Sequence, residues 1–250
     1  MGGSSVETLT SEQVLREDLA AAFRLAARFD WHEGVANHFS AAVSADGKQF
    51  LVNPRWQHFS TIKASDLLLL DADDVNVMTR ANAPDPSAWC IHGAIHRNLP
   101  HGRVLLHLHP PYATALMGLK DPTLKPIDQS TARFYNRVAV DLSFGGIADD
   151  KAEGERLARA FGNHHTMLMG NHGVITAQTT VAQAFDELYY LERACKTMLL
   201  AYSTGQELAI MDHETADKTA KGWDDYQGMG KAHFAHWKQV LNREEPDYRD

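Results

Sequence analysis

The sequence predicts an α/β domain in which helices cover both faces of a β-sheet. Short apolar runs bounded by turn residues, as in strands, alternate with longer segments whose apolar residues recur every three or four positions, as in helices. No repeat, linker or low-complexity tract interrupts the 250 residues. We therefore expect a single domain over residues 1–250, with its core at about 12–205, a C-terminal extension at 206–250, and a mobile start and tail.

The individual elements follow from local patterns. A helix is expected at about 12–29, where Thr10 and Gln13 have capping-box spacing, and strands at 41–43 and 50–52 are joined by a typical Asp-Gly hairpin turn. The same criteria predict, in chain order, a strand at 67–70, a helix at 87–98, a strand at 104–109, a helix at 111–118, a strand at 135–140, a helix at 151–161, and strands at 167–169 and 174–176. The longest helix begins at Thr180 and ends before Gly205.

Composition argues against several classes of partner. The formal net charge of −8 argues against nucleic acid, because phosphate binding needs a basic surface. The apolar run 67–70 is far shorter than the roughly 20 residues of a membrane span, and the first residues lack the features of a secretory signal. Cys90 and Cys195 are expected as buried thiols of a reducing compartment. We therefore predict a cytoplasmic protein with no nucleic-acid or membrane partner.

Histidine is the unusual residue, with 14 copies against 24 lysines and arginines, which favours metal or proton chemistry. His107 and His109 lie two apart in a predicted strand, so both imidazoles project to the same side. The two prolines that follow place the pair at the carboxyl end of that strand, where clefts in α/β sheets tend to lie. Such a pair suits a transition metal, although so short a motif also occurs as two solvent-facing histidines.

A third ligand is needed, and His172 is the candidate. It lies in a glycine-flanked turn between two predicted strands. A turn of this kind lets the backbone approach a metal closely and fixes the direction of the ring. It is also where a histidine can simply tolerate unusual dihedral angles. The residues alone leave both interpretations open.

Two blocks of the chain resemble the class II aldolase/adducin family. They read IHGAIHRNLPHGRVLLHLHPPYATALMG at 91–118 and MLMGNHGVITAQTTVAQAFDELYYLERACK at 167–196. The earlier segments NHFSAAV and FLVNPRWQHFSTIKASDLLLLD are similar to the N-terminal hairpin of the family and the segment after it. The resemblance covers about residues 12–205 and is closer to the adducin-like branch, through GVANHFS and YYLERACK.

This resemblance implies more than composition does. It implies a three-layer α/β/α sandwich around a mostly antiparallel, mixed sheet. It implies that His107, His109 and His172 bind a divalent metal, commonly zinc, with manganese or iron as other candidates. It also implies a small-molecule substrate and a homotetramer with its sites at subunit interfaces.

One departure from the family changes the expected chemistry. In its sugar-phosphate aldolases a Ser-Ser-Glu segment begins the helix before the metal-binding strand, and its glutamate transfers protons. Aligned on Trp89 and His92, this chain has Pro86, Ser87 and Ala88 there. Alanine cannot transfer a proton, and a positioned acid or base contributes about 10²–10⁴-fold to a rate. Ordinary aldolase activity on phosphorylated sugars is therefore not expected.

Three residues are candidates for the missing proton carrier. Glu33 precedes the hairpin, His92 lies one helical turn after Ala88, and Tyr135 lies in a polar-aromatic segment. Each has a plainer alternative: an exposed acid for Glu33, a core histidine bonded to backbone for His92, and an anchor of an irregular stretch for Tyr135.

The candidate substrate-binding residues are Arg55, Asn37 and Ser87. Arg55 aligns with a phosphate-loop position of the aldolases, and its guanidinium suits a carboxylate or phosphate, or else forms an ion pair. Asn37 matches a small polar position of the anion loop with a one-residue difference in spacing. Ser87 retains one of the two phosphate-binding serines.

These residues support three hypotheses. The first is a divalent-metal-dependent lyase of decarboxylase or aldolase type, acting on a small hydroxy or oxo carboxylate, in which the metal stabilises an enolate. Decarboxylation is attractive because loss of CO₂ forms the enolate without a base. The alternatives are a non-catalytic adducin-like binding or assembly domain, and a non-haem metal oxygenase.

Overall fold

A mixed sheet of seven strands passes through the middle of the molecule in the order β3-β2-β1-β4-β7-β6-β5. The computed structural model describes residues 11–147, 149–226 and 228–250. All neighbouring strands pair antiparallel except β5 and β6, which are parallel. The strands are β1 (His38–Ala42), β2 (Gln49–Val52), β3 (Leu68–Asp71), β4 (Val104–Leu108), β5 (Val138–Asp141), β6 (Thr166–Met169) and β7 (Val174–Gln178).

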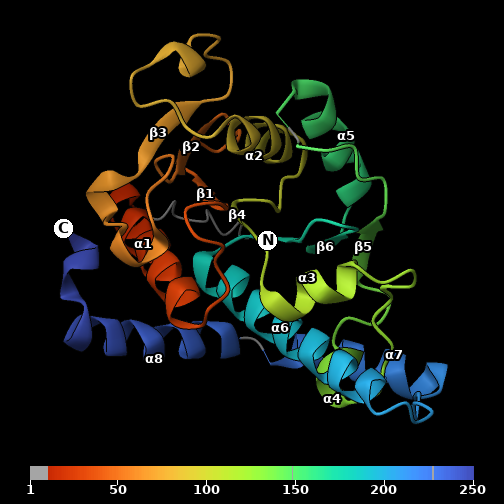
Figure 1. The fold of residues 1–250 in the computed structure, drawn as a ribbon. Helices are drawn as coiled ribbons and strands as arrows, with labels where there is room; N and C mark the ends of the chain where they lie inside the picture. The colour runs from red at the N-terminus through yellow and green to blue at the C-terminus, as the bar shows by residue number, and fades with distance from the viewer. Residues whose placement is uncertain (1–10, 148, 227) are drawn as a thin grey trace, which may run out of the picture.

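Helices form the two outer layers. They are α1 (Glu12–Arg28), α2 (Pro86–Asn98), α3 (Pro111–Met117), α4 (Gln129–Ala132), α5 (Lys151–Phe161), α6 (Val181–Ser203), α7 (His213–Gly222) and α8 (Met229–Glu244). One core joins α1, α3 and α6 to the sheet, and a second joins α2 and α5 to its other face. Figure 1 shows α2 and α5 on one side of the strands and α1, α3 and α6 on the other. This arrangement confirms the predicted α/β/α sandwich around a mostly antiparallel sheet.

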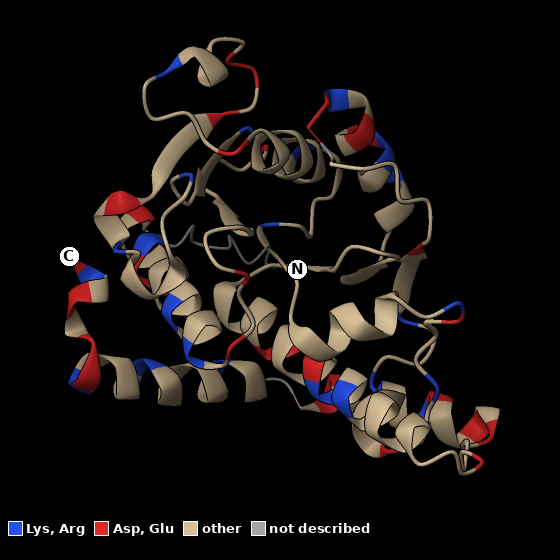
Figure 2. Ribbon diagram, in the orientation of Figure 1, with Lys and Arg blue, Asp and Glu red and all other residues tan. Residues whose placement is uncertain are grey.

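Charged side chains lie mostly on the helices and connections. Among the residues of the strands, only Asp71 and Asp141 are acidic or basic. Figure 2 accordingly shows strands that are almost free of charge and outer helices that carry both signs. The polar groups inside the sheet are imidazoles and hydroxyls, so proton and metal chemistry in this layer depends on them.

Local capping explains where the main helices begin. Asp85 caps α2 by accepting a hydrogen bond from the Ser87 amide, and Thr180 caps α6 by accepting one from the Gln183 amide. At α1 the cap is Ser11, which accepts from the Val14 amide at 3.4 Å, whereas the predicted cap Thr10 lies outside the described residues.

Two expectations about the fold are wrong. The strand predicted at 135–140 begins only at Val138, because the chain turns through Asn136, whose φ is 55°, and the Arg137 amide bonds back to the Phe134 carbonyl. The tail is packed rather than loose, since Phe234, Leu241 and Tyr248 are buried in the core that α1 and α6 share. No described helix has the length and apolar character that crossing a membrane requires.

Candidate metal centre

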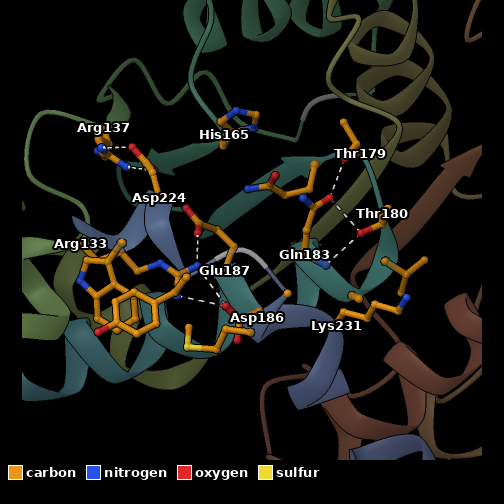
Figure 3. A pocket seen from close by; sticks show the side chains of 18 of the residues that line it. Arg133, Arg137, His165, Thr179, Thr180, Gln183, Asp186, Glu187, Asp224 and Lys231 are labelled. Atoms are coloured by element: carbon orange, nitrogen blue, oxygen red, sulfur yellow. Dashed lines mark hydrogen bonds and ion pairs between the residues drawn. The ribbon is translucent and has the colours of Figure 1, made fainter. Parts of the chain in front are cut away.

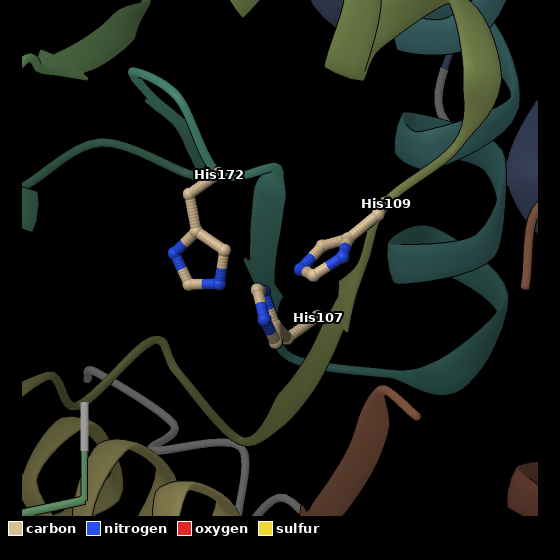
Figure 4. A group of neighbouring side chains, drawn as sticks. All are labelled: His107, His109 and His172. Carbon is tan, nitrogen blue, oxygen red and sulfur yellow. The ribbon is translucent and has the colours of Figure 1, made fainter. Parts of the chain in front are cut away.

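His107, His109 and His172 converge at one end of the sheet. His107 lies in β4, His109 follows the end of that strand, and His172 lies in the turn between β6 and β7. One ring nitrogen from each lies within 4.8 Å of those of the other two. Figure 4 shows the three rings facing a shared space.

The outer nitrogens of two of these rings are already occupied. His107 Nδ1 donates to the Val174 carbonyl at 2.9 Å, and His109 Nδ1 lies 2.5 Å from Glu33 Oε2. The Nε2 atom of His109 is buried and has no hydrogen-bond partner among the described residues. This is the arrangement by which proteins hold imidazoles for a metal, with one nitrogen anchored and the other left to bind. The site therefore fits a divalent cation.

The turn that carries His172 is closed by short backbone contacts. The Met169 amide donates to the Gly173 carbonyl at 2.9 Å, and the His172 amide donates to the Met169 carbonyl at 3.2 Å. A Cβ atom on Gly173 would lie 2.4 Å from Cδ2 of His109 and 2.7 Å from the Leu108 carbonyl oxygen. Only glycine allows β4 and this turn to approach so closely, so Gly173 is needed to bring the third imidazole to the other two.

Burial keeps the imidazoles of His107 and His172 neutral. It lowers the pKa of His172 from 6.5 to about 4 and holds the pKa of His107 well below its usual range, and the neighbouring imidazoles lower both further. Neutral imidazole is the form that binds a metal ion, so at neutral pH no proton has to leave these two rings first.

A second group of histidines lies directly behind the cluster. His38 of β1 is paired with His107 across the sheet, and their ring centroids are 4.8 Å apart. His38 Nδ1 lies 2.6 Å from His92 Nε2, and His92 Nδ1 contacts Ser40 Oγ. Ser40 Oγ also lies 2.7 Å from Nε2 of His96. We call this run, from His38 to His96, the buried histidine chain.

Both ends of the buried histidine chain contact other polar groups. At the inner end, His96 Nδ1 donates to the Gly102 carbonyl at 2.6 Å. At the outer end, His38 Nε2 lies 3.1 Å from Ser87 Oγ, which donates to Asp85 at 2.6 Å. His38 and His96 are not among the residues predicted from the sequence, although two patterns carry the signal. His92 and His96 have i, i+4 spacing on α2, and His38 and Ser40 alternate onto one face of β1.

The three predicted proton carriers have different surroundings. Glu33 reaches the cluster, but through the outer nitrogen of His109. His92 is fully buried and is separated from the cluster by His38. Tyr135 precedes β5, at the end of that strand away from the turn of His172, and its hydroxyl lies 3.1 Å from His213 Nδ1. Within this chain the structure brings Glu33 and the buried histidine chain to the cluster, and not Tyr135.

The three predicted substrate-binding residues lie around Asp85 and β1. Arg55 Nε is 3.6 Å from a carboxylate oxygen of Asp85, and its guanidinium covers the exposed Trp56 ring at 4.1 Å. Asn37 precedes β1, and its buried Oδ1 has no partner among the described residues. Ser87 connects Asp85 to His38. All three therefore lie near the outer end of the buried histidine chain.

A larger cavity lies at the opposite end of the strands. This groove of about 1310 Å³ is lined by Gln178 at the end of β7 and by His165 just before β6. Figure 3 shows that its two arginines are paired with carboxylates: Arg137 bonds to Asp224, and Arg133 bonds to Asp186 and Glu187. Those arginines are already neutralised, whereas the histidine cluster offers unpaired nitrogen, so the cluster is the better candidate for chemistry.

Comparisons with known proteins identify the family of this chain. The family model "Class II Aldolase and Adducin N-terminal domain" matches residues 17–199. The chain belongs to this family. A solved aldolase II superfamily protein from Pseudomonas syringae is 33% identical, has a TM-score of 0.88 and covers 98% of both chains. A putative aldolase class 2 protein of Caulobacter vibrioides is 28% identical over 96% of this chain and 93% of its own length.

A further relative bears an activity in its name. The protein named decarboxylase NovR of Streptomyces niveus is 28% identical over 86% of this chain and 82% of its own length. Family membership confirms the resemblance to class II aldolases and adducins. Class II aldolases typically depend on a divalent metal, and the three converging histidines of this chain could bind one.

Proposed function

We propose that this protein is a divalent-metal-dependent lyase acting on a small carboxylate that also bears a hydroxy or oxo group. The observation that carries the proposal is the convergence of one nitrogen from each of His107, His109 and His172, two of the rings being anchored through their other nitrogen. Zinc is the metal we expect first, with manganese or iron as alternatives, since imidazole suits all three.

The metal and the protein have separate roles in this proposal. A bound divalent cation supplies a Lewis acid that stabilises the negative charge developing on a substrate oxygen. Arg55 offers a cation for a substrate carboxylate, and Asn37 and Ser87 offer hydrogen-bonding groups beside it. Glu33 holds the imidazole of His109 in place. Of the candidate proton carriers, His92 reaches the site through His38, and Tyr135 would need another chain to bring it there.

Decarboxylation is the form of the reaction we favour. Ala88 supplies no acid or base, and loss of CO₂ needs no base to begin it, so only the later return of a proton requires a donor. The name of the Streptomyces niveus relative supports this choice. Aldol cleavage differs because a base must first remove a hydroxyl proton from the substrate.

The setting of the protein is part of the proposal. We expect a homotetramer, as the family resemblance implies, with a small molecule as its ligand. Cys90 and Cys195 are free thiols, which supports a reducing compartment such as the cytoplasm. A non-catalytic adducin-like assembly domain is the competing function.

Metal content tests the proposal directly. Purified protein should hold about one divalent ion per chain by elemental analysis, and the double variant His107→Ala, His109→Ala should hold none. The matched control is His101→Ala, His165→Ala, which removes another pair of adjacent rings, 4.7 Å apart, away from the cluster. Full occupancy in the first variant would refute the assignment. Stable oligomers without metal, and without turnover on a panel of hydroxy and oxo acids, would favour the assembly domain instead.

A further inference from the structure

The hydrogen bonds of the buried histidine chain all run in one direction, which the Gly102 carbonyl at its inner end sets. The Gly102 carbonyl only accepts hydrogen bonds, so His96 carries its proton on Nδ1, and its Nε2 must accept from the Ser40 hydroxyl. The Ser40 oxygen then accepts from Nδ1–H of His92, whose Nε2 in turn accepts from Nδ1–H of His38. Each neutral imidazole has one nitrogen that donates and one that accepts. The order ends with an unprotonated Nε2 on His38.

The opposite order of protons would leave two hydrogen-bond acceptors, His96 Nδ1 and the Gly102 carbonyl, facing each other with no donor between them. If His38 donated from Nε2 to Ser87, every proton along the chain would move to the other nitrogen, and His96 would point a lone pair at the Gly102 carbonyl 2.6 Å away. Burial opposes a second proton on His96, because it lowers the pKa of that ring to about 3. His96 is buried, so no ligand can enter to separate the two acceptors.

The proton positions set by Gly102 leave two hydrogen-bond acceptors facing each other at the outer end of the chain, beside the histidine cluster. Ser87 has one hydroxyl proton, and it donates that proton to the Asp85 carboxylate at 2.6 Å, a charge-assisted bond. The contact from Ser87 Oγ to His38 Nε2 is longer, at 3.1 Å, and then joins two acceptors. Ser87 is only partly buried, so a donor from outside can reach this pair.

We propose that the buried histidine chain fixes His38 as the Nδ1–H tautomer, so that His38 Nε2 and Ser87 Oγ together accept a hydrogen bond from a hydroxyl group of the substrate. The identity of that ligand rests on the proposed function. The tautomer of His38 is argued from the hydrogen bonds alone and does not depend on that function. The inference narrows the substrate class to carboxylates that carry a hydroxyl group in addition to the oxo group on which the enolate forms, because an acid with an oxo group alone brings no donor to this position. Ser40, His92 and His96 act as positioning residues through His38.

The tautomer can be read by NMR without any assay of activity. Zinc-loaded protein labelled with ¹⁵N-histidine gives long-range ¹H–¹⁵N correlations that separate the two neutral tautomers from the cation. His38 signals are assigned by their loss in His38→Asn. We expect His38 protonated on Nδ1 alone in the wild type, and a second tautomer to become populated in Ser40→Ala but not in Ser65→Ala, an exposed serine. A wild-type His38 protonated on Nε2 would overturn the inference.

Recognition of the hydroxyl is tested by binding of two acids that differ in that group. Calorimetry with mandelate and phenylacetate on the zinc-loaded protein gives the preference for the hydroxyl. Ser40→Ala should reduce that preference about tenfold, the equivalent of one hydrogen bond, with zinc content unchanged. The same preference in wild type and Ser40→Ala would overturn hydroxyl recognition through His38. Failure of both acids to bind would overturn the proposed ligand class, while the NMR spectrum still judges the tautomer.

Discussion

Two groups of three histidines lie side by side in this molecule, and they use the same side chain in opposite ways. In the candidate metal-binding cluster of His107, His109 and His172, the first two each have one nitrogen anchored, and Nε2 of His109 has no partner among the described residues. In the buried histidine chain, both nitrogens of His92 and His96 have partners. An unpaired nitrogen can accept a ligand. A ring whose two nitrogens both have partners can only fix the position of the proton on the next ring.

The difference between the groups arises from their supporting elements. The cluster is formed where β4 ends and the turn between β6 and β7 closes, so its three rings face one another. The buried histidine chain lies between β1 and α2, where His92 and His96 can meet only other polar groups of the protein. The comparison predicts that substitutions in the cluster change metal binding, and that substitutions in the buried chain change stability and ligand preference.

The largest effect is expected from Gly173→Ala. The added methyl would collide with the His109 ring and with the Leu108 carbonyl, so β4 and the turn of His172 must separate. We expect zinc affinity to fall more than about a hundredfold, as when an imidazole is lost from the set. Competition with a chromogenic chelator measures it. Gly222→Ala is the matched control, because a Cβ there meets nothing within 4 Å. Unchanged affinity in Gly173→Ala would show that the close approach is not needed.

The next largest effect is expected on the pH dependence of the free energy of unfolding, through His96 of the buried histidine chain. The pKa of His96 is about 3 when folded and about 6.5 when unfolded, so below pH 6.5 the unfolded chain binds a proton that the folded chain does not. Stability from this ring is therefore complete above pH 6.5 and falls towards pH 3, by about 1.4 kcal/mol per pH unit. Urea unfolding of His96→Gln should show a pH slope that is smaller by this amount. If His165→Gln, at an exposed histidine, lowered the slope equally, the effect would not come from the buried chain.

Much of the fold could be predicted from the sequence because apolar periodicity and capping residues are local signals. The helices at α2, α5 and α6 and the strands at β4, β6 and β7 lie within about two residues of their predicted bounds. The strand expected at 135–140 begins only at Val138, because residues 135–137 form a turn at Asn136 that no apolar pattern marks. The packing of the C-terminal extension on α1 and α6 depends on contacts distant in sequence, which periodicity does not reveal.

The site was predictable only in part, for a related reason. His107 and His109 could be paired from strand alternation. The glycine-flanked turn made His172 a candidate, and the family resemblance decided in its favour. The roles of His38 and His96 depend on which strand lies beside β4 and which helix covers it, and no single segment contains that information. Asp85 was missed because a helix cap is a common role for aspartate, and its link to His38 passes through Ser87.

The smallest effect on zinc affinity is expected from Glu33→Ala. This variant shows whether Glu33 holds the His109 ring in place or transfers a proton to the substrate. The Glu33 carboxylate holds Nδ1 of His109, whereas His107 is held by the Val174 carbonyl, which no side-chain change removes. Loss of such a partner weakens metal binding 10–100-fold, and we expect about tenfold here because Glu33 is largely exposed to water. Glu155→Ala, which removes a surface carboxylate paired with Arg97, should leave zinc affinity unchanged. If Glu33→Ala instead kept full zinc affinity and lowered kcat alone, Glu33 would be the proton carrier that Ala88 does not supply, and its contact with His109 would be incidental.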